Sequence, residues 1–157
     1  MKKKFLVAVM VVVMIMMTIL LVGCVDPNNG NNDSNENNNK LEVISMSLGF
    51  MQNVDAEGEF ISVNIKNYNG KKLKDLLEGD KTLGAKIENG MLVSIKGLEA
   101  DNDKHLFISV YTSQEEYKSD YGDIIEKGGT TYYPANVGIN DLPVNKECKY
   151  LFVLMSW

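Results

Sequence analysis

Residues 60–79 read FISVNIKNYNGKKLKDLLEG, and this stretch decides the fold. Within its first seven residues, Ile61, Val63 and Ile65 alternate with Ser62, Asn64 and Lys66, which predicts a strand with one buried face. The triplet Tyr68-Asn69-Gly70 then has the composition of a turn. Residues 71–78 carry leucines at positions i, i+3 and i+4, the spacing of one helix face, and Gly79 follows as the expected C-cap. The apolar positions of the two elements are Ile61, Val63, Ile65, Leu73, Leu76 and Leu77.

Short strands are predicted around this helix. Asn89-Gly90 indicates a hairpin turn between strands at 85–88 and 91–95, and Gly97 breaks the second of them. Further strands are predicted at 105–111 and 149–157, which are apolar enough to be central, and at 41–50, which is weaker. One helix packed on a mixed sheet of about five strands is an α+β fold.

Two segments of this region resemble a known family. Residues 72–77 (KLKDLL) and 91–98 (MLVSIKGL), followed by a closing apolar strand, are similar to an uncharacterised family of secreted or lipid-anchored bacterial domains. That family is related to the C-terminal domain of transcobalamin-like proteins. The resemblance covers residues 60–157 and implies a small β-grasp-like domain.

The resemblance does not extend to the ligand-contacting strand of the family. In the family, the strand after the Ile-x-Gly element carries an aromatic pair with Trp and then an Asn-Gly turn. Residues 106–113 of this chain read LFISVYTS, with neither feature. Cobalamin binding is therefore not carried over to this chain.

The start of the chain has the pattern of an export signal. Met1–Lys4 contain three lysines, and residues 5–22 are an apolar run with one polar residue. Leu21-Val22-Gly23-Cys24 resembles the lipobox of bacterial lipoproteins, which implies removal of residues 1–23 as a signal peptide and a diacylglycerol on Cys24. An uncleaved membrane helix is the alternative, because about 18 apolar residues can span a bilayer. Both interpretations place an outward-facing domain at the cell membrane.

The composition after the signal limits the partners. Residues 24–40 form the lipidated cysteine and an Asn-rich linker that is predicted to be disordered, and residues 41–157 are expected to form a single extracytoplasmic domain. Loss of the three lysines of the signal changes the formal charge from −5 to −5 − 3 = −8. Every basic residue is Lys, so the bidentate guanidinium of Arg is missing and nucleic acid is not an expected partner. The domain is expected to be a monomer.

Few residues indicate catalysis. His105 is the only histidine and is expected at an exposed strand end, whereas Asp101-Asn102-Asp103 has the composition of an Asx turn rather than of a calcium loop. If Cys24 is lipidated, Cys148 has no disulfide partner, and it is interpreted as a small buried hydrophobe rather than a reactive thiol. The sequence predicts no catalytic residues, no metal site and no cofactor, and therefore a protein that is not an enzyme. A pair of catalytic carboxylates remains open, because their separation is a three-dimensional quantity.

Tyrosines are the most suggestive local feature. They fall within a polar, glycine-punctuated stretch from Tyr111 to Ala135, and Tyr121 and Tyr132 are the candidates for ligand binding. The alternative is that these rings are packing residues of the sheet. The leading hypothesis is a lipid-anchored surface lipoprotein whose domain binds a small ligand, a glycan or a protein partner. The alternatives are a structural or accessory envelope lipoprotein without a ligand and, third, an acid-dependent hydrolase.

Overall fold

The strand predicted at residues 60–66 forms one half of a hairpin at the edge of the main sheet. The computed structural model describes residues 42–157. In it, β1 (Val43–Met51) pairs antiparallel with β2 (Glu59–Lys66). Val63 and Ile65 of β2 are buried, and the polar residues between and after them are exposed. The predicted alternation is confirmed.

Three predictions fall before this region. The signal peptide at 1–23, the lipidated Cys24 and the linker at 24–40 lie outside the described residues. No helix among residues 42–157 has the length and apolar character needed to span a membrane.

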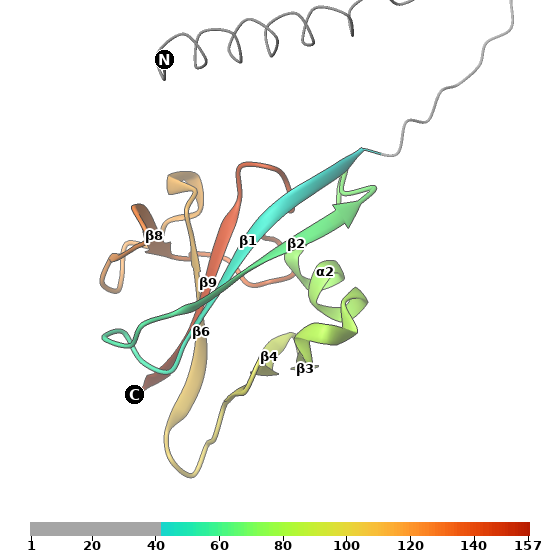
Figure 1. Ribbon diagram of the computed structural model, residues 1–157. Helices are drawn as coiled ribbons and strands as arrows, with labels where there is room; N and C mark the ends of the chain where they lie inside the picture. Colours follow the sequence, from blue (N-terminus) through green and yellow to red (C-terminus); the bar gives the residue numbers. More distant parts are fainter. Residues whose placement is uncertain (1–41) are drawn as a thin grey trace, which may run out of the picture. The chain divides into compact units, whose positions relative to one another are not determined.

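The main sheet is mixed and has six strands in the order β2-β1-β9-β6-β8-β7. Its first strand, β1, runs parallel to the last one, and every other neighbouring pair is antiparallel. Figure 1 shows β1, β2, β6 and β9 side by side, with β8 on the far side from α2. The remaining strands of this sheet are β6 (Leu106–Thr112), β7 (Ile125–Lys127), β8 (Thr130–Pro134) and β9 (Lys149–Ser156).

The expected count of about five strands is therefore wrong, although the broader α+β class agrees with the structure. The sequence did not predict β7 and β8, because both are short and neither has an alternating apolar pattern that would indicate their pairing across Gly128-Gly129. The weak strand predicted at 41–50 is also an interior one, since β1 lies between β2 and β9.

A second sheet of three short strands lies beside the helix, in the order β3-β4-β5. Its two turns each place consecutive residues at positive φ: Asn89 (50°) with Gly90 (80°), and Lys96 (47°) with Gly97 (77°). This is the conformation that two-residue hairpin turns require. The hairpin at Asn89-Gly90 is confirmed. The strands are β3 (Lys86–Glu88), β4 (Met91–Ile95) and β5 (Leu98–Glu99).

The helix α2 (Leu73–Gly79) buries its three leucines, as the spacing predicts. Its first N–H groups need partners from outside the helix. Leu73 N donates to Leu142 O (2.8 Å) and Lys74 N donates to Ile139 O (3.0 Å), so the loop before β9 holds the helix start. The prediction of Gly79 as C-cap is wrong, because Asp80 caps the helix in an extended conformation and then caps the 3-10 turn η2 (Lys81–Leu83).

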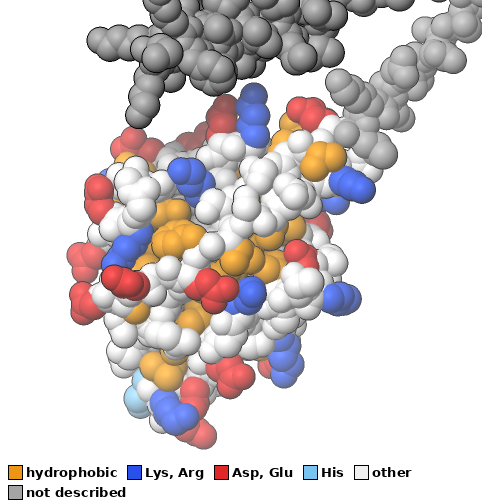
Figure 2. All heavy atoms as spheres, viewed as in Figure 1, with side chains coloured by type: hydrophobic (Ala, Val, Ile, Leu, Met, Phe, Trp, Pro, Cys, Tyr) orange, Lys and Arg blue, Asp and Glu red, His pale blue; other side chains and the backbone are white. Residues whose placement is uncertain are grey.

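Both faces of the main sheet are covered. The first cluster joins the helix leucines to β1, β2, β6 and β9. The second cluster lies on the opposite face and is made of Met51, Tyr111, Ile125, Tyr132, Leu151 and Val153. On the surface, Figure 2 shows lysines and acids interspersed around hydrophobic side chains in the middle of the viewed face. A further 3-10 turn, η3 (Glu115–Tyr117), lies in the connection between β6 and β7.

Candidate ligand-binding groove

A groove of about 740 Å³ lies between the small sheet, β6 and the loop at Gly138-Ile139. Its volume falls within the range of about 300–1,000 Å³ that small-molecule sites occupy. The groove has an apolar floor, because all but one of its buried or half-buried lining residues are hydrophobic, Ser94 being the exception. The hydrophobic ones are Leu92, Val93, Ala100, Leu106, Ile108, Val110 and Ile139.

The alternation of β6 builds one side of this floor. Successive side chains of a strand point to opposite faces, so Ile108 and Val110 belong to the helix-side cluster, whereas Tyr111 belongs to the other cluster. The opposite wall is the β3–β4 hairpin. Its tip lies close to the loop before β9, since a Cβ built on Gly90 would be 3.3 Å from Asn140 Nδ2.

The rim of the groove is polar. Asn89 and Asn102 are exposed lining residues, and Ser94 is half-buried. Lys86 and Glu88 also line the groove, but they pair with each other, with Lys86 Nζ 2.7 Å from Glu88 Oε1. This hydrogen bond raises the pKa of Lys86 above its ordinary value. Glu99 is a further exposed lining residue, so the rim offers a ligand one carboxylate beside its amide and hydroxyl groups.

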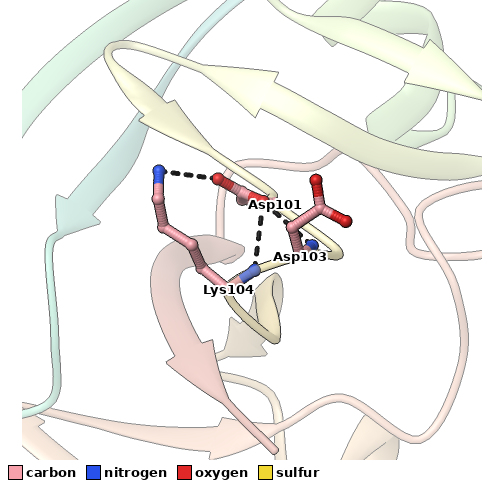
Figure 3. A network of polar contacts seen from close by, with 3 residues as sticks. All are labelled: Asp101, Asp103 and Lys104. Atoms are coloured by element: carbon pink, nitrogen blue, oxygen red, sulfur yellow. Dashed lines mark hydrogen bonds and ion pairs between the residues drawn. The ribbon is translucent and has the colours of Figure 1, made fainter.

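An Asx turn at Asp101–Lys104 supplies one lining residue of the groove, Asn102. Figure 3 shows the Asp101 carboxylate between the Lys104 ammonium and the backbone of the turn. Asp101 Oδ2 is 2.7 Å from Lys104 Nζ, and Asp101 Oδ1 accepts hydrogen bonds from the N–H groups of Asp103 (3.0 Å) and Lys104 (3.2 Å). The Lys104 ammonium and these N–H groups hold the pKa of the Asp101 carboxyl below its ordinary value. The predicted Asx turn is confirmed, and the Asp101 carboxylate stabilises it through these contacts.

The two candidate tyrosines have different surroundings. Tyr121 is 85% exposed, whereas Tyr132 is only 2% exposed and packs in the second cluster. The expectation that Tyr132 is an exposed binding residue is therefore wrong. Neighbouring residues in a strand face opposite ways, and Tyr133 is accordingly half-buried, with Lys118 Nζ 5.2 Å from its ring centre. Neither Tyr121 nor Tyr132 lines the groove.

The other chemically versatile residues lie away from the groove. His105 is exposed, and its ring meets the Trp157 ring edge-on at 5.4 Å. Cys148 is 1% exposed, its Sγ is 3.0 Å from Gln114 Oε1, and burial raises the pKa of the thiol. Burial likewise raises the pKa of Tyr150, whose hydroxyl donates to Pro143 O. Across residues 42–157 no three His, Cys, Asp or Glu side chains are grouped so as to hold a metal ion.

The structure thus defines a small α+β domain with an apolar-floored groove, and comparison with known proteins agrees at the level of the fold. No protein-family model matches the chain, and no curated protein matches it. It is similar to a protein of Ruminococcus gnavus described as a candidate for metal binding, with 14% identity and a TM-score of 0.51 over 73% of this chain and 98% of that one. This similarity shows the fold alone.

A second solved structure is more distant. Haptocorrin, a transcobalamin-like protein solved in complex with Cbi, is 17% identical, with a TM-score of 0.47. The match covers 82% of this chain and 27% of haptocorrin. The relation is weak and confined to the fold.

Proposed function

We propose that this chain is a lipid-anchored, outward-facing binding protein without enzymatic activity, and that its ligand occupies the groove between the β3–β4 hairpin and β6. The observation that carries the proposal is the groove itself: about 740 Å³, with an apolar floor and a polar rim that includes Asn and Ser groups. Such a combination of apolar lining with a few polar groups is typical of ligand sites. The similar R. gnavus protein is described as a candidate for metal binding, which is loosely consistent with a binding role.

We also infer that β2-β1-β9-β6 and α2 form a β-grasp-like core. The support is the order of these strands and the parallel pairing of the first strand with the last. In this core the groove lies at the β6 side, where the small sheet turns away from the main one.

The groove is tested with N-phenyl-1-naphthylamine, an uncharged probe that fluoresces in apolar surroundings. The substitution Gly138→Phe adds a large side chain to a groove residue, and a Cβ built there meets nothing within 4 Å. The matched control is Gly79→Phe, because Gly79 also has open space but ends the helix outside the groove. We expect Gly138→Phe to weaken probe binding by about tenfold or more. The added side chain takes up space in the groove, so the probe loses roughly the burial of one of its rings.

Fluorescence titration of the full chain measures the three dissociation constants. Equal affinity of the wild type and both variants would place the probe elsewhere and contradict the groove. A chain that binds no probe at all would instead favour the accessory role without a ligand.

The anchor is proposed from the Leu21-Val22-Gly23-Cys24 junction. Cys24→Ala removes the thiol that would receive the diacylglycerol, so incorporation of labelled fatty acid should be lost. The variant should keep its signal and stay at the membrane through residues 5–22. Metabolic labelling with a Cys148→Ala control checks this, and equal labelling of the wild type and the Cys24 variant would exclude the lipoprotein interpretation.

A further inference from the structure

The edge of β6 that borders the groove is open over a short length. At one end, Leu106 exchanges backbone hydrogen bonds with Asp101 (2.8 and 3.0 Å). At the other end, Val110 O accepts from Ala135 N (3.0 Å), and β8 pairs only with Tyr111 and Thr112. Beyond Ala135 the chain turns away, because Asn136 N donates to Tyr117 O (2.8 Å).

The alternation of the backbone shows which groups face this gap. His105 O accepts from Trp157 N (3.2 Å) and Ser113 N donates to Lys149 O (3.0 Å), so odd-numbered residues direct their backbone groups toward β9. Even-numbered residues therefore direct theirs to the opposite edge.

Three backbone groups consequently face the groove: Ile108 N–H, Ile108 C=O and Val110 N–H. Within the part of the chain that the structure describes, no residue supplies a backbone partner to them on this edge. Both residues line the groove. Backbone polar groups in apolar surroundings need hydrogen-bond partners, and a ligand is the partner that this position can receive.

We propose that the groove binds an extended peptide segment, which adds a short strand to the open edge of β6; this rests on the groove being the binding site. A peptide backbone offers N–H and C=O groups at the strand spacing of the edge, as in recognition by strand addition. The gap from Leu106 to Val110 spans about 13 Å at roughly 3.4 Å per residue, room for three or four peptide residues.

The side chains of such a peptide would alternate between two environments. One set would rest on the apolar floor of Leu106, Ile108 and Val110, and the other would meet the Asn and Ser groups of the rim. A glycan or an apolar small molecule could occupy the same volume, but neither repeats N–H and C=O groups at the spacing of the edge.

The test is amide hydrogen exchange of the ¹⁵N-labelled full chain, followed residue by residue by NMR. In the free protein, we expect Ile108 and Val110 to exchange at least about tenfold faster than Phe107 and Ser109, whose N–H groups bond to β9. The probe is a pool of acetylated, C-amidated pentapeptides of valine and threonine in all orders. Saturation with this pool should slow Ile108 and Val110 by about tenfold or more, to rates close to those of Phe107 and Ser109.

The matched control pool carries an N-methyl group on every peptide nitrogen, so it keeps the side chains but cannot donate to Ile108 O. We expect no slowing with this pool, and none when Gly138→Phe is given the first pool, whereas Gly79→Phe should behave as the wild type. Slow exchange of Ile108 and Val110 in the free protein would show that the edge is already paired and would overturn the proposal. Failure of the pentapeptides to slow these amides, with naphthylamine binding intact, would exclude a peptide while leaving the groove as the site.

Discussion

Phe152→Ala is expected to lower the free energy of unfolding by about 3–5 kcal/mol, which is typical of removing a buried aromatic ring. Phe152 is 0% exposed and lies in β9, between β1 and β6. Its ring stacks on Phe50 with centroids 5.5 Å apart and planes 12° from parallel. Both flanking strands hold their positions through hydrogen bonds, so they cannot close the cavity left by the ring. Urea denaturation followed by circular dichroism measures the change.

The matched control is Phe107→Ala on the neighbouring strand. Phe107 is 37% exposed and contacts Trp157, with ring centres 5.8 Å apart. Because much of its ring already meets water, we expect a loss of less than about half that of Phe152→Ala. Phe152→Leu retains most of the volume and should cost about 1–2 kcal/mol, which provides a measurable variant if the alanine protein does not fold. Equal losses at positions 107 and 152 would show that β9 is not the centre of the core.

The elements that could be predicted are those with one clear local pattern. β2 alternates strictly, and α2 carries its leucines on one face, so each needs only its own residues to identify the buried side. Asn89-Gly90 is similar, because both residues readily adopt positive φ. Lys96-Gly97 forms the same kind of turn, yet it indicated only a break, since Lys rarely takes this conformation.

β1 shows why an interior strand was predicted to be weak. Its buried residues Ile44, Met46, Leu48 and Phe50 alternate with small ones, and Gly49 lowers its strand propensity. In the structure, side chains of the neighbouring strands pack over Gly49 and stabilise β1. A Cβ built on Gly49 would lie 2.6 Å from the Phe60 ring of β2 and 2.8 Å from Leu151 of β9, so the glycine lets these side chains cover the backbone.

The groove could not be predicted, because it arises from where segments end rather than from a motif. It exists because the chain leaves β6 after Ala135, and because on the other side only Asp101, just after the small sheet, pairs with β6. Those two departures are about 35 residues apart in the sequence and meet only in the fold. The sequence signal nearest to the groove was the Asn89-Gly90 hairpin, which forms one wall but does not reveal what it faces.

The expectation of an exposed ring was wrong at Tyr132 for a related reason. A Tyr-Tyr pair in a strand places one ring on each face. Which ring is buried depends on which face of β8 is covered by other residues, and β8 itself was not predicted. Tyr132 packs with Tyr111, Ile125 and Leu151, and burial raises the pKa of its hydroxyl. Tyr121 remains a candidate for a contact outside the groove.

Tyr132→Ala should therefore lower the free energy of unfolding by about 3 kcal/mol or more, because it removes a buried ring from the second cluster. Tyr121→Ala should change it by no more than about 0.5 kcal/mol, as expected for a side chain that is 85% exposed. Thermal and urea denaturation of both variants measure the two values. Tyr132→Phe separates the ring from the hydroxyl: if the ring dominates, this variant should stay within about 1 kcal/mol of the wild type. A stable Tyr132→Ala protein that loses binding of the naphthylamine or of the peptide pool would reverse the assignment and make Tyr132 a ligand contact reached through motion of β7 and β8.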